Sequence, residues 1–301
     1  MTTPDLFPTR AERKIPMSDR LDPTVFADSS SRKDGPLDER ELKSYEENGY
    51  LFFDGFFTPA EMQGFLDDLR ESEDDEDLKL SEGTILEPGK QEIRSIFGIH
   101  EISERFDRLT RDPRLLDMVR QILASEVYIH QSRINYKPGF KGKGFNWHSD
   151  FETWHSEDGM PRMRSLSCSI VLTDNVESNG PLMLIPGSHR KFVPCIGRTP
   201  ENNYQESLKS QTVGVPDEGS LRRLMNDGGI DVPTGPAGSL ILFECNTLHG
   251  SNQNMSCWPR SNLFFVYNSV ENTLADPYCG NRPRPNFLAN RTDWSPLTPI
   301  A

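Results

Sequence analysis

A series of short apolar segments in the second half of the chain, with Gly, Pro and Asn between them, places the strongest constraint on the fold. The segments occupy 126–139, 164–174, 181–189, 238–250 and 260–270. In a strand, successive side chains point to opposite faces, and strands punctuated in this way are typical of antiparallel sandwiches and barrels. The second half is therefore predicted to form antiparallel sheets.

The first half has a different pattern. Residues 37–73 predict a helix, a short strand and a second helix, and helical periodicity returns at 104–124. Thr58 followed by Pro59 is a typical N-cap and first-turn pair for the second helix. Helices first and strands afterwards predict an α+β protein: a double-stranded β-helix (jelly-roll or cupin-like) core flanked by helices.

The chain divides into three kinds of segment. Residues 1–36 are rich in Pro, Ser, Asp and Arg and are predicted to be an N-terminal arm that wraps the domain or frays. Residues 37–301 are predicted to be a single domain. Within it, 197–238 is a polar, Gly-rich insertion with a helical piece around EGSLRRLMND. Such an insertion is either an active-site lid or a disordered segment.

Charge and composition exclude several classes of function. The net charge is −13, which argues against a nucleic-acid partner because phosphate contacts need clustered Lys and Arg. No run approaches the ~18 apolar residues of a membrane span, and the N-terminus has no signal-peptide pattern. The five cysteines form no C-x-x-C pair, so neither a zinc ribbon nor a disulfide framework is indicated. We expect a cytoplasmic protein without a membrane partner.

The stretch FNWHSDFETWH, at 145–155, contains a candidate metal site. On a strand, His148 and Asp150 would point to the same face and could bind one ion together. On a helix, His148 and His155 would share a face but lie two turns apart, which is too far for one metal. The aromatic residues and Thr favour a strand followed by a loop. The H-x-D pattern alone is common by chance, so a third ligand is needed.

His249 is the candidate third ligand. It ends a predicted buried strand about 100 residues after Asp150, and in a double-stranded β-helix such a position can return to the first pair. Two imidazoles and one carboxylate form the facial triad of non-haem Fe(II) oxygenases, which leaves coordination positions open for a cosubstrate and O₂.

Arg260 provides a second indication. It stands eleven residues after His249 and shares a strand face with Phe264. An Arg buried inside a barrel needs an anion, because an unpaired buried charge is very unfavourable. A dicarboxylate such as 2-oxoglutarate would chelate iron at one end and meet the guanidinium fork at the other. Alternatively, Arg260 is a surface residue at a strand end.

The segment 126–139 carries polar groups on one predicted face. Alternation gives one face of Val127, Ile129, Gln131, Arg133, Asn135 and Lys137, and an opposite face of Tyr128, His130, Ser132, Ile134 and Tyr136. The first face lines either a polar pocket or a solvent-exposed edge.

The stretch from 145 to 195, beginning FNWHSDFETWHSEDGMPRMRSLSCSIVLTDN, closely resembles the motif of the ectoine hydroxylases. These enzymes belong to the phytanoyl-CoA dioxygenase-like branch of the Fe(II)/2-oxoglutarate oxygenases. The blocks HQSRINYKPG and FECNTLHGSNQN are similar too. The resemblance implies hydroxylation of ectoine to 5-hydroxyectoine in compatible-solute biosynthesis, with O₂ consumed and succinate and CO₂ released. It also suggests a homodimer.

The resemblance further implies a role for individual residues. Iron ligands, which are also the catalytic centre, are implied at His148, Asp150 and His249. Contacts to 2-oxoglutarate are implied at Asn135, Lys137, Ser251 and Arg260. Ectoine contacts are implied at Gln131, Thr153, Trp154, Phe243 and Phe264, and the role of Ser167 is open. Arg133 shares the strand face of Gln131 and is a candidate either for the ectoine carboxylate or for a structural ion pair. The alternatives are the same chemistry on another small cyclic amino acid, a non-catalytic jelly-roll binding module, or a metal-dependent hydrolase.

Overall fold

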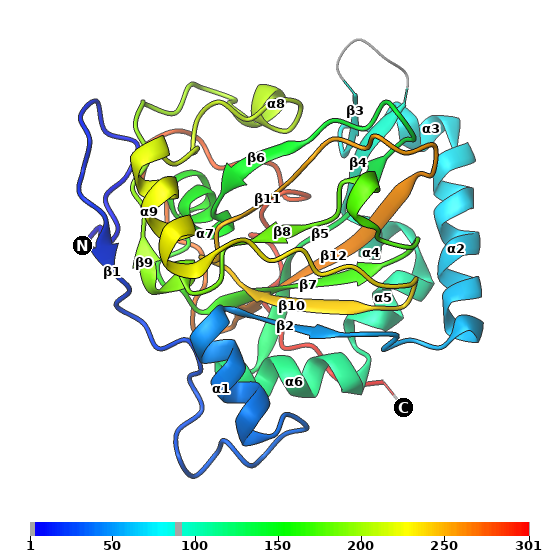
Figure 1. The fold of residues 1–301 in the computed structure, drawn as a ribbon, viewed down its shortest axis with the longest axis horizontal. Coiled ribbons are helices and arrows are strands. Elements are labelled where there is room, and N and C mark those ends of the chain that lie inside the picture. Colours follow the sequence, from blue (N-terminus) through cyan, green and yellow to red (C-terminus); the bar gives the residue numbers. More distant parts are fainter. Residues whose placement is uncertain (1–3, 88–91, 301) are drawn as a thin grey trace.

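Two antiparallel sheets form the centre of the computed structural model, which describes residues 4–87 and 92–300 (Figure 1). The larger sheet has seven strands in the order β2-β10-β7-β12-β5-β4-β3, and the smaller has the order β6-β11-β8. Residues 1–3 of the predicted arm and residue 301 lie outside the described residues. The strands are β1 Ser18–Asp19, β2 Tyr50–Phe53, β3 Thr84–Leu86, β4 Ile93–Phe97, β5 Val127–Lys137, β6 Phe145–His148, β7 Ser165–Val171, β8 Met183–Leu184, β9 Lys191–Phe192, β10 Leu240–Glu244, β11 His249–Ser251 and β12 Arg260–Ser269.

Helices cover the face of the large sheet that is turned away from the small sheet (Figure 1). They are α1 Glu39–Asn48, α2 Pro59–Asp74, α3 Glu76–Lys79, α4 Ile99–Ile102, α5 Glu104–Thr110 and α6 Pro113–Leu123, while α7 Asp150–Thr153, α8 Tyr204–Ser207 and α9 Glu218–Gly228 lie elsewhere. A π-helix, η1, follows α7 at Trp154–Asp158, and short 3₁₀ turns lie at Glu177–Asn179 and Ser188–Arg190.

Alternation along the strands divides the core into two layers. In β10, Leu240 and Leu242 pack with the helices in the main core. Ile241 and Phe243 point the other way and pack with Leu184 of the small sheet. One set of side chains thus joins the sheet to the helices, and the other fills the space between the sheets. This arrangement confirms the predicted α+β fold with a jelly-roll core.

The face assignment for β5 is correct for only part of the strand. The pairing of β12 with β5 shifts register between Val266, opposite Gln131, and Tyr267, opposite Ile129, so that His130 is passed over. Such a bulge moves the following side chains to the other face. Ile129 therefore packs with Ile134 in the helix-covered core, whereas Gln131 and the alternate residues after it face the space between the sheets. The expectation that Val127 and Ile129 share the polar face is wrong for this reason.

The described part of the N-terminal arm packs against the domain. Phe7 is buried among aromatic side chains of Phe151 and Phe192, and β1 pairs with β9. In the insertion, the predicted helical piece is α9, which begins one residue after the N-cap Asp217. No helix among the described residues is long and apolar enough to cross a membrane.

Helix α2 offers a test of the local sequence signal. The hydroxyl of Thr58 accepts a hydrogen bond from the Glu61 backbone N–H, and the Glu61 side chain caps the Thr58 backbone in return. Thr58→Ala should lower the free energy of unfolding by about 1 kcal/mol, measured by urea denaturation. Thr58→Ser keeps the hydroxyl and should be close to the parent protein. Because α2 lies at the edge remote from β6 and β11 (Figure 1), neither change should alter metal binding.

Candidate metal centre and adjoining pocket

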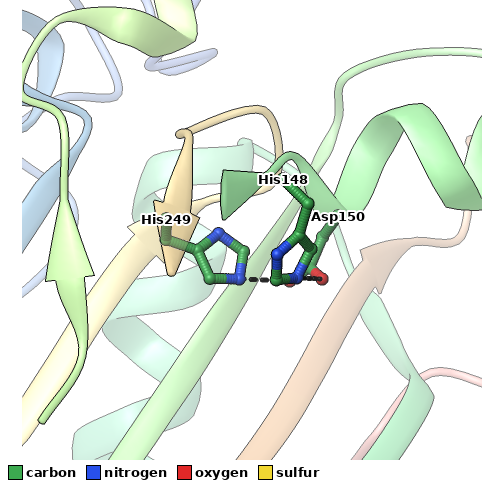
Figure 2. A group of neighbouring side chains, drawn as sticks. All are labelled: His148, Asp150 and His249. Carbon is green, nitrogen blue, oxygen red and sulfur yellow. Dashed lines mark ion pairs between the residues drawn. The ribbon is translucent and has the colours of Figure 1, made fainter. Parts of the chain in front are cut away.

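His148, Asp150 and His249 converge at one end of the small sheet (Figure 2). One ligand atom from each lies within 4.8 Å of the others. The Nε2 atom of His148 is 3.7 Å from one carboxylate oxygen of Asp150, and Nε2 of His249 is 3.9 Å from the other oxygen. Among the described residues this is the one group of three His, Cys, Asp or Glu side chains with such a spacing.

Strand pairing brings the two imidazoles together. His148 ends β6 and His249 begins β11, and their Cα atoms are direct partners in the antiparallel register. Asp150 is positioned differently from our expectation: it is the first residue of α7, and Ser149 caps that helix by accepting from the Glu152 N–H. The strand therefore ends at His148, and the expected loop is a short helix that continues into η1.

Backbone hydrogen bonds fix the orientation of both imidazole rings. Nδ1 of His148 is 2.7 Å from the Asn146 carbonyl oxygen, and Nδ1 of His249 is 3.0 Å from the Thr247 carbonyl oxygen. A carbonyl can only accept, so each Nδ1 carries the proton and each Nε2 presents a lone pair. This is the ring arrangement found in protein ligands to metals.

The charge states also suit a cation. Burial raises the pKa of Asp150, but the two imidazoles and Arg133 outweigh it and hold the pKa below its ordinary value. Burial, together with His148, lowers the pKa of His249 to about 4. Near neutral pH the site therefore offers a carboxylate and a neutral imidazole at His249. Two imidazole nitrogens and one carboxylate on one side of an ion match the donor set of non-haem Fe(II) sites.

A cavity between the two sheets opens onto this triad. All three triad residues line it, together with most of the other residues proposed from the sequence: Gln131, Arg133, Asn135, Thr153, Trp154, Ser251, Arg260 and Phe264. Lys137 and Phe243 are not on its wall. Lys137 lies behind Ser251, to whose hydroxyl its Nζ donates at 2.7 Å. The Phe243 ring packs edge-on against the His249 imidazole, with centroids 5.0 Å apart.

Two buried basic side chains lie at one end of the cavity, Arg260 on the wall and Lys137 behind it. Arg260 is 3 % exposed, and its guanidinium donates to the Gly180 carbonyl oxygen from Nε at 3.2 Å and from Nη2 at 2.6 Å. Lys137 is fully buried nearby; burial, Arg260 and Arg94 lower its pKa to about 6. Among the described residues, no carboxylate forms an ion pair with either side chain. This end of the cavity therefore has the charge that a buried anion requires.

Arg133 and Gln131 form a linked pair on the wall beyond the triad. The Gln131 amide donates to the Leu288 carbonyl oxygen at 2.7 Å and its oxygen accepts from Arg133. The Arg133 guanidinium lies 4.6 Å from the centre of the Phe264 ring. Both the amide nitrogen and the oxygen of Gln131 thus form hydrogen bonds within the protein, and Gln131 fixes the position of the Arg133 guanidinium. Ser167 donates to Asp150 at 3.4 Å and so contacts the triad from behind.

Several wall residues were not anticipated from the sequence. Arg284 lies on the wall and forms a two-pronged ion pair with Asp158, at 2.7 and 2.6 Å. Glu157, in η1, is also on the wall. Arg284 stands in a Pro-rich segment without periodicity, so no pattern in the sequence pointed to it. Glu157 lies within the 145–195 stretch, but the predicted strand and loop gave no reason to place its side chain in the cavity.

The insertion covers one side of the cavity. Leu208, Gln211 and Val213 lie on its wall. The Leu208 carbonyl oxygen accepts from Arg94 at 3.0 Å, and the Gln211 carbonyl oxygen accepts from Asn146 at 2.9 Å. The segment around 207–213 thus closes over the space beside the triad.

Comparison with known proteins agrees with this geometry. Residues 45–262 match the family model described as phytanoyl-CoA dioxygenase (PhyH). The chain belongs to the phytanoyl-CoA dioxygenase family. Among family relatives, the ectoine dioxygenase of Bordetella bronchiseptica is 50% identical over 98% of this chain and 96% of the relative. That of Halomonas elongata is 51% identical over 97% and 88%, respectively.

Solved structures agree with the family assignment. The crystal structure of EctD from S. alaskensis with 2-oxoglutarate and 5-hydroxyectoine is 44% identical, with a TM-score of 0.89 over 99% of this chain and 98% of that one. The structure of the same protein with bound Fe has a TM-score of 0.86 at 43% identity, with the same coverage.

The triad of this phytanoyl-CoA dioxygenase family member can be tested by metal binding. Asp150→Ala should weaken Fe(II) affinity by more than the roughly 10- to 100-fold that follows loss of an outer hydrogen-bond partner, because a direct ligand is removed. Anaerobic titration calorimetry measures this. His100→Gln is the matched control, since His100 contacts Ser132 and lies outside the triad. Fe(II) affinity of Asp150→Ala equal to that of the control would contradict the assignment.

Proposed function

We propose that this protein hydroxylates ectoine to 5-hydroxyectoine in an Fe(II)- and 2-oxoglutarate-dependent reaction that consumes O₂ and releases succinate and CO₂. The observation that carries the proposal is a two-histidine, one-carboxylate centre that shares its cavity with Arg260, which is buried and has no ion-pair partner among the described residues. A metal centre and a buried guanidinium in one cavity suit a cosubstrate that chelates the metal at one end and has a free carboxylate at the other. The relatives named ectoine dioxygenases support ectoine as the substrate.

In this proposal, Nε2 of His148, Nε2 of His249 and the Asp150 carboxylate hold Fe(II). The metal supplies the oxidative chemistry, in which O₂ and 2-oxoglutarate are used to hydroxylate a C–H bond. The two backbone carbonyls described above fix the orientation of the imidazole rings, with Nε2 of each ring turned toward the site. Phe243 backs the His249 ring, so that this ligand has little freedom to rotate.

The positive end of the cavity binds 2-oxoglutarate. Arg260 would pair with the carboxylate remote from the metal, and Ser251, held by Lys137, would donate its hydroxyl to the same group. Asn135 lies on the same wall, where its side-chain oxygen accepts from Ser95 at 2.8 Å. Its amide NH2 has no hydrogen-bond acceptor among the described residues and would donate to the cosubstrate. These contacts place the dianion beside the Arg260 guanidinium and close to Lys137, which takes up a proton when the dianion binds.

Ectoine occupies the remaining space beyond the triad. It is a small cyclic amidine with a carboxylate, and its delocalised cation would lie against the rings of Trp154 or Phe264, a contact worth about 0.5–2 kcal/mol. Thr153 offers a hydroxyl beside Trp154. Arg133 faces the same region and lacks an ion-pair partner among the described residues, so it is our candidate for the ectoine carboxylate.

Product analysis tests the reaction directly. The protein, loaded with Fe(II) and supplied with 2-oxoglutarate and O₂, should convert ectoine to a product heavier by one oxygen atom, with one succinate formed per product, by mass spectrometry. A panel of cyclic amino acids and other compatible solutes serves as the comparison. If a different solute is converted in preference to ectoine, the proposed substrate is wrong and the proposed oxygenase reaction is still supported. Absence of any succinate would refute the oxygenase.

Lys137 gives a prediction specific to the cosubstrate site. Its lowered pKa of about 6 leaves it mostly neutral at pH 7.5 in the free protein. A bound dianion favours the charged form and raises the pKa, so 2-oxoglutarate binding should take up close to one proton at pH 7.5 and almost none at pH 5, where Lys137 is charged in both states. Anaerobic calorimetry in buffers of different ionisation enthalpy measures the uptake.

Lys137→Met provides the comparison for that measurement. It should abolish the proton uptake at pH 7.5 and weaken 2-oxoglutarate binding. Uptake that persists in Lys137→Met would assign the proton to another group.

The remaining parts of the proposal concern organisation and location. We propose a homodimer of single domains, 37–301, each with its N-terminal arm 1–36 and insertion 197–238, acting in the cytoplasm. Light scattering of the purified protein tests the dimer.

A further inference from the structure

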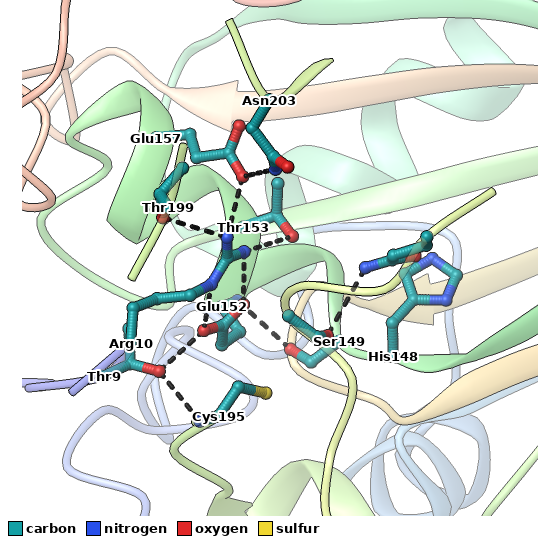
Figure 3. Close-up of polar contacts among 12 residues, drawn as sticks. Thr9, Arg10, His148, Ser149, Glu152, Thr153, Glu157, Cys195, Thr199 and Asn203 are labelled. Carbon is teal, nitrogen blue, oxygen red and sulfur yellow. Dashed lines mark hydrogen bonds and ion pairs between the residues drawn. The ribbon is translucent and has the colours of Figure 1, made fainter. Parts of the chain in front are cut away.

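Arg10 of the N-terminal arm joins three separate segments beside the pocket (Figure 3). Its guanidinium donates to both carboxylate oxygens of Glu152 at 2.8 Å and to Glu157 at 2.9 Å. It also donates to the hydroxyls of Thr153 at 3.2 Å and Thr199 at 3.1 Å. Every one of these partners lies at least 142 residues away in sequence.

The backbone holds Arg10 at this position. Its φ is 57°, in the left-handed region that residues other than Gly rarely adopt. The Arg10 N–H donates to the Cys195 carbonyl oxygen at 2.9 Å, and the next residue, Ala11, bridges to Ile196. The arm is thus paired with the chain at the start of the insertion. The unfavourable backbone conformation of Arg10 is compensated by its ion pairs and hydrogen bonds, which require the side chain at this position.

The carboxylates bound by Arg10 flank the residues that line the pocket. Glu152 precedes Thr153 and Trp154, and Glu157 is on the wall itself. Both carboxylates are buried, so they need a cation to remain charged there. Burial lowers the pKa of Arg10, but the two carboxylates outweigh it and raise the pKa above its ordinary value. The guanidinium is therefore charged and contacts Glu152 and Glu157, one on each side of Thr153 and Trp154.

Arg10 also lies close to both ends of the covering segment, residues 199–214, of which 207–213 lies over the cavity. Thr199 is a direct partner, and Asn203 donates to the Glu157 oxygen that accepts from Arg10, at 2.8 Å. At the other end, Gly214 has φ +77°, and a Cβ at this position would lie 2.5 Å from Nη2 of Arg10 and 2.9 Å from the Glu152 carboxylate. Its neighbour Val213 lines the cavity.

We propose that Arg10 is a positioning residue for the substrate pocket: it holds the Thr153–Trp154 wall and the covering segment 199–214 in one arrangement. The inference rests on the proposed function, because it assigns the pocket to ectoine. The metal ligand Asp150 has anchors of its own at the start of α7: the Phe151 N–H donates to the Cys245 carbonyl oxygen at 2.8 Å, and Ser167 donates to the Asp150 carboxylate. The 2-oxoglutarate end lies on other strands. Loss of Arg10 should therefore affect ectoine binding and orientation while leaving cosubstrate binding in place.

Three variants test this role. Arg10→Gln removes the charge, Arg10→Lys keeps the charge without the two-pronged fork, and Gly214→Ala disturbs the same contact from the covering segment without removing a buried charge. Arg10→Gln and Gly214→Ala should raise the Kd and KM for ectoine by about tenfold or more, because displacement of the Thr153–Trp154 wall would remove ectoine contacts equivalent to about one charge-assisted hydrogen bond. Arg10→Lys should lie between Arg10→Gln and the parent protein.

Two readouts separate positioning from general damage. Anaerobic Fe(II) and 2-oxoglutarate affinities should stay within about twofold, and succinate should form in excess of hydroxylated product, because a misplaced substrate leaves the oxidation uncoupled. Lys14→Ala is the control: Lys14 is on the same arm and pairs with Asp217 at the surface. It should match the parent in every measurement.

Hydrogen exchange provides a readout that needs no substrate. Amides of 152–158 and 199–214 should exchange faster in Arg10→Gln and Gly214→Ala than in Lys14→Ala. If Arg10→Gln does not fold, Gly214→Ala decides. The proposal is overturned if ectoine affinity and coupling are unchanged, or if ectoine and 2-oxoglutarate affinities fall together. If the parent protein does not bind or hydroxylate ectoine, the proposed function is wrong. If hydrogen exchange of 152–158 and 199–214 is the same in the variants as in the parent protein, the role of Arg10 is wrong.

Discussion

The direct pairing of His148 with His249 across two short strands is the constraint on which the active centre depends. Residues that lie directly opposite each other in an antiparallel pair have their side chains on the same face and close together, and this places two imidazoles, about 100 residues apart in sequence, on one side of a potential ion. The third ligand then needs only the turn into α7. A metal site of this kind requires few residues beyond those that already form the sheet, because the sheet does the positioning.

The basic side chains of the cavity differ in their surroundings, and this difference indicates which ligand each region can bind. Arg260 lies on the wall with Lys137 behind it, and neither has an acidic partner among the described residues. An anionic cosubstrate is favoured there because it relieves an unfavourable burial of charge. The region around Trp154 and Phe264 combines aromatic faces with the Arg133 guanidinium, so it suits a molecule that has both a ring and a carboxylate.

Sequence patterns predicted the strands, the helices around Thr58 and the three triad residues, because each depends on local spacing or on a motif. The errors arose where one residue changes the geometry of a whole element. The bulge at His130 reverses the alternation of β5, and the N-cap at Ser149 converts an expected loop into a helix. Arg10 and Arg284 were missed for another reason: their partners lie far away in sequence, and neither segment has a periodicity.

The contacts of Arg10 have a consequence for how the protein matures during folding. A residue near the beginning of the chain finds its partners 142 or more positions later, so its ion pairs can form only when α7 and η1 are already in place. Closing a loop of this length has an entropic penalty that those contacts must offset. The conformation of the arm is therefore tied to residues that follow it by almost half the length of the chain.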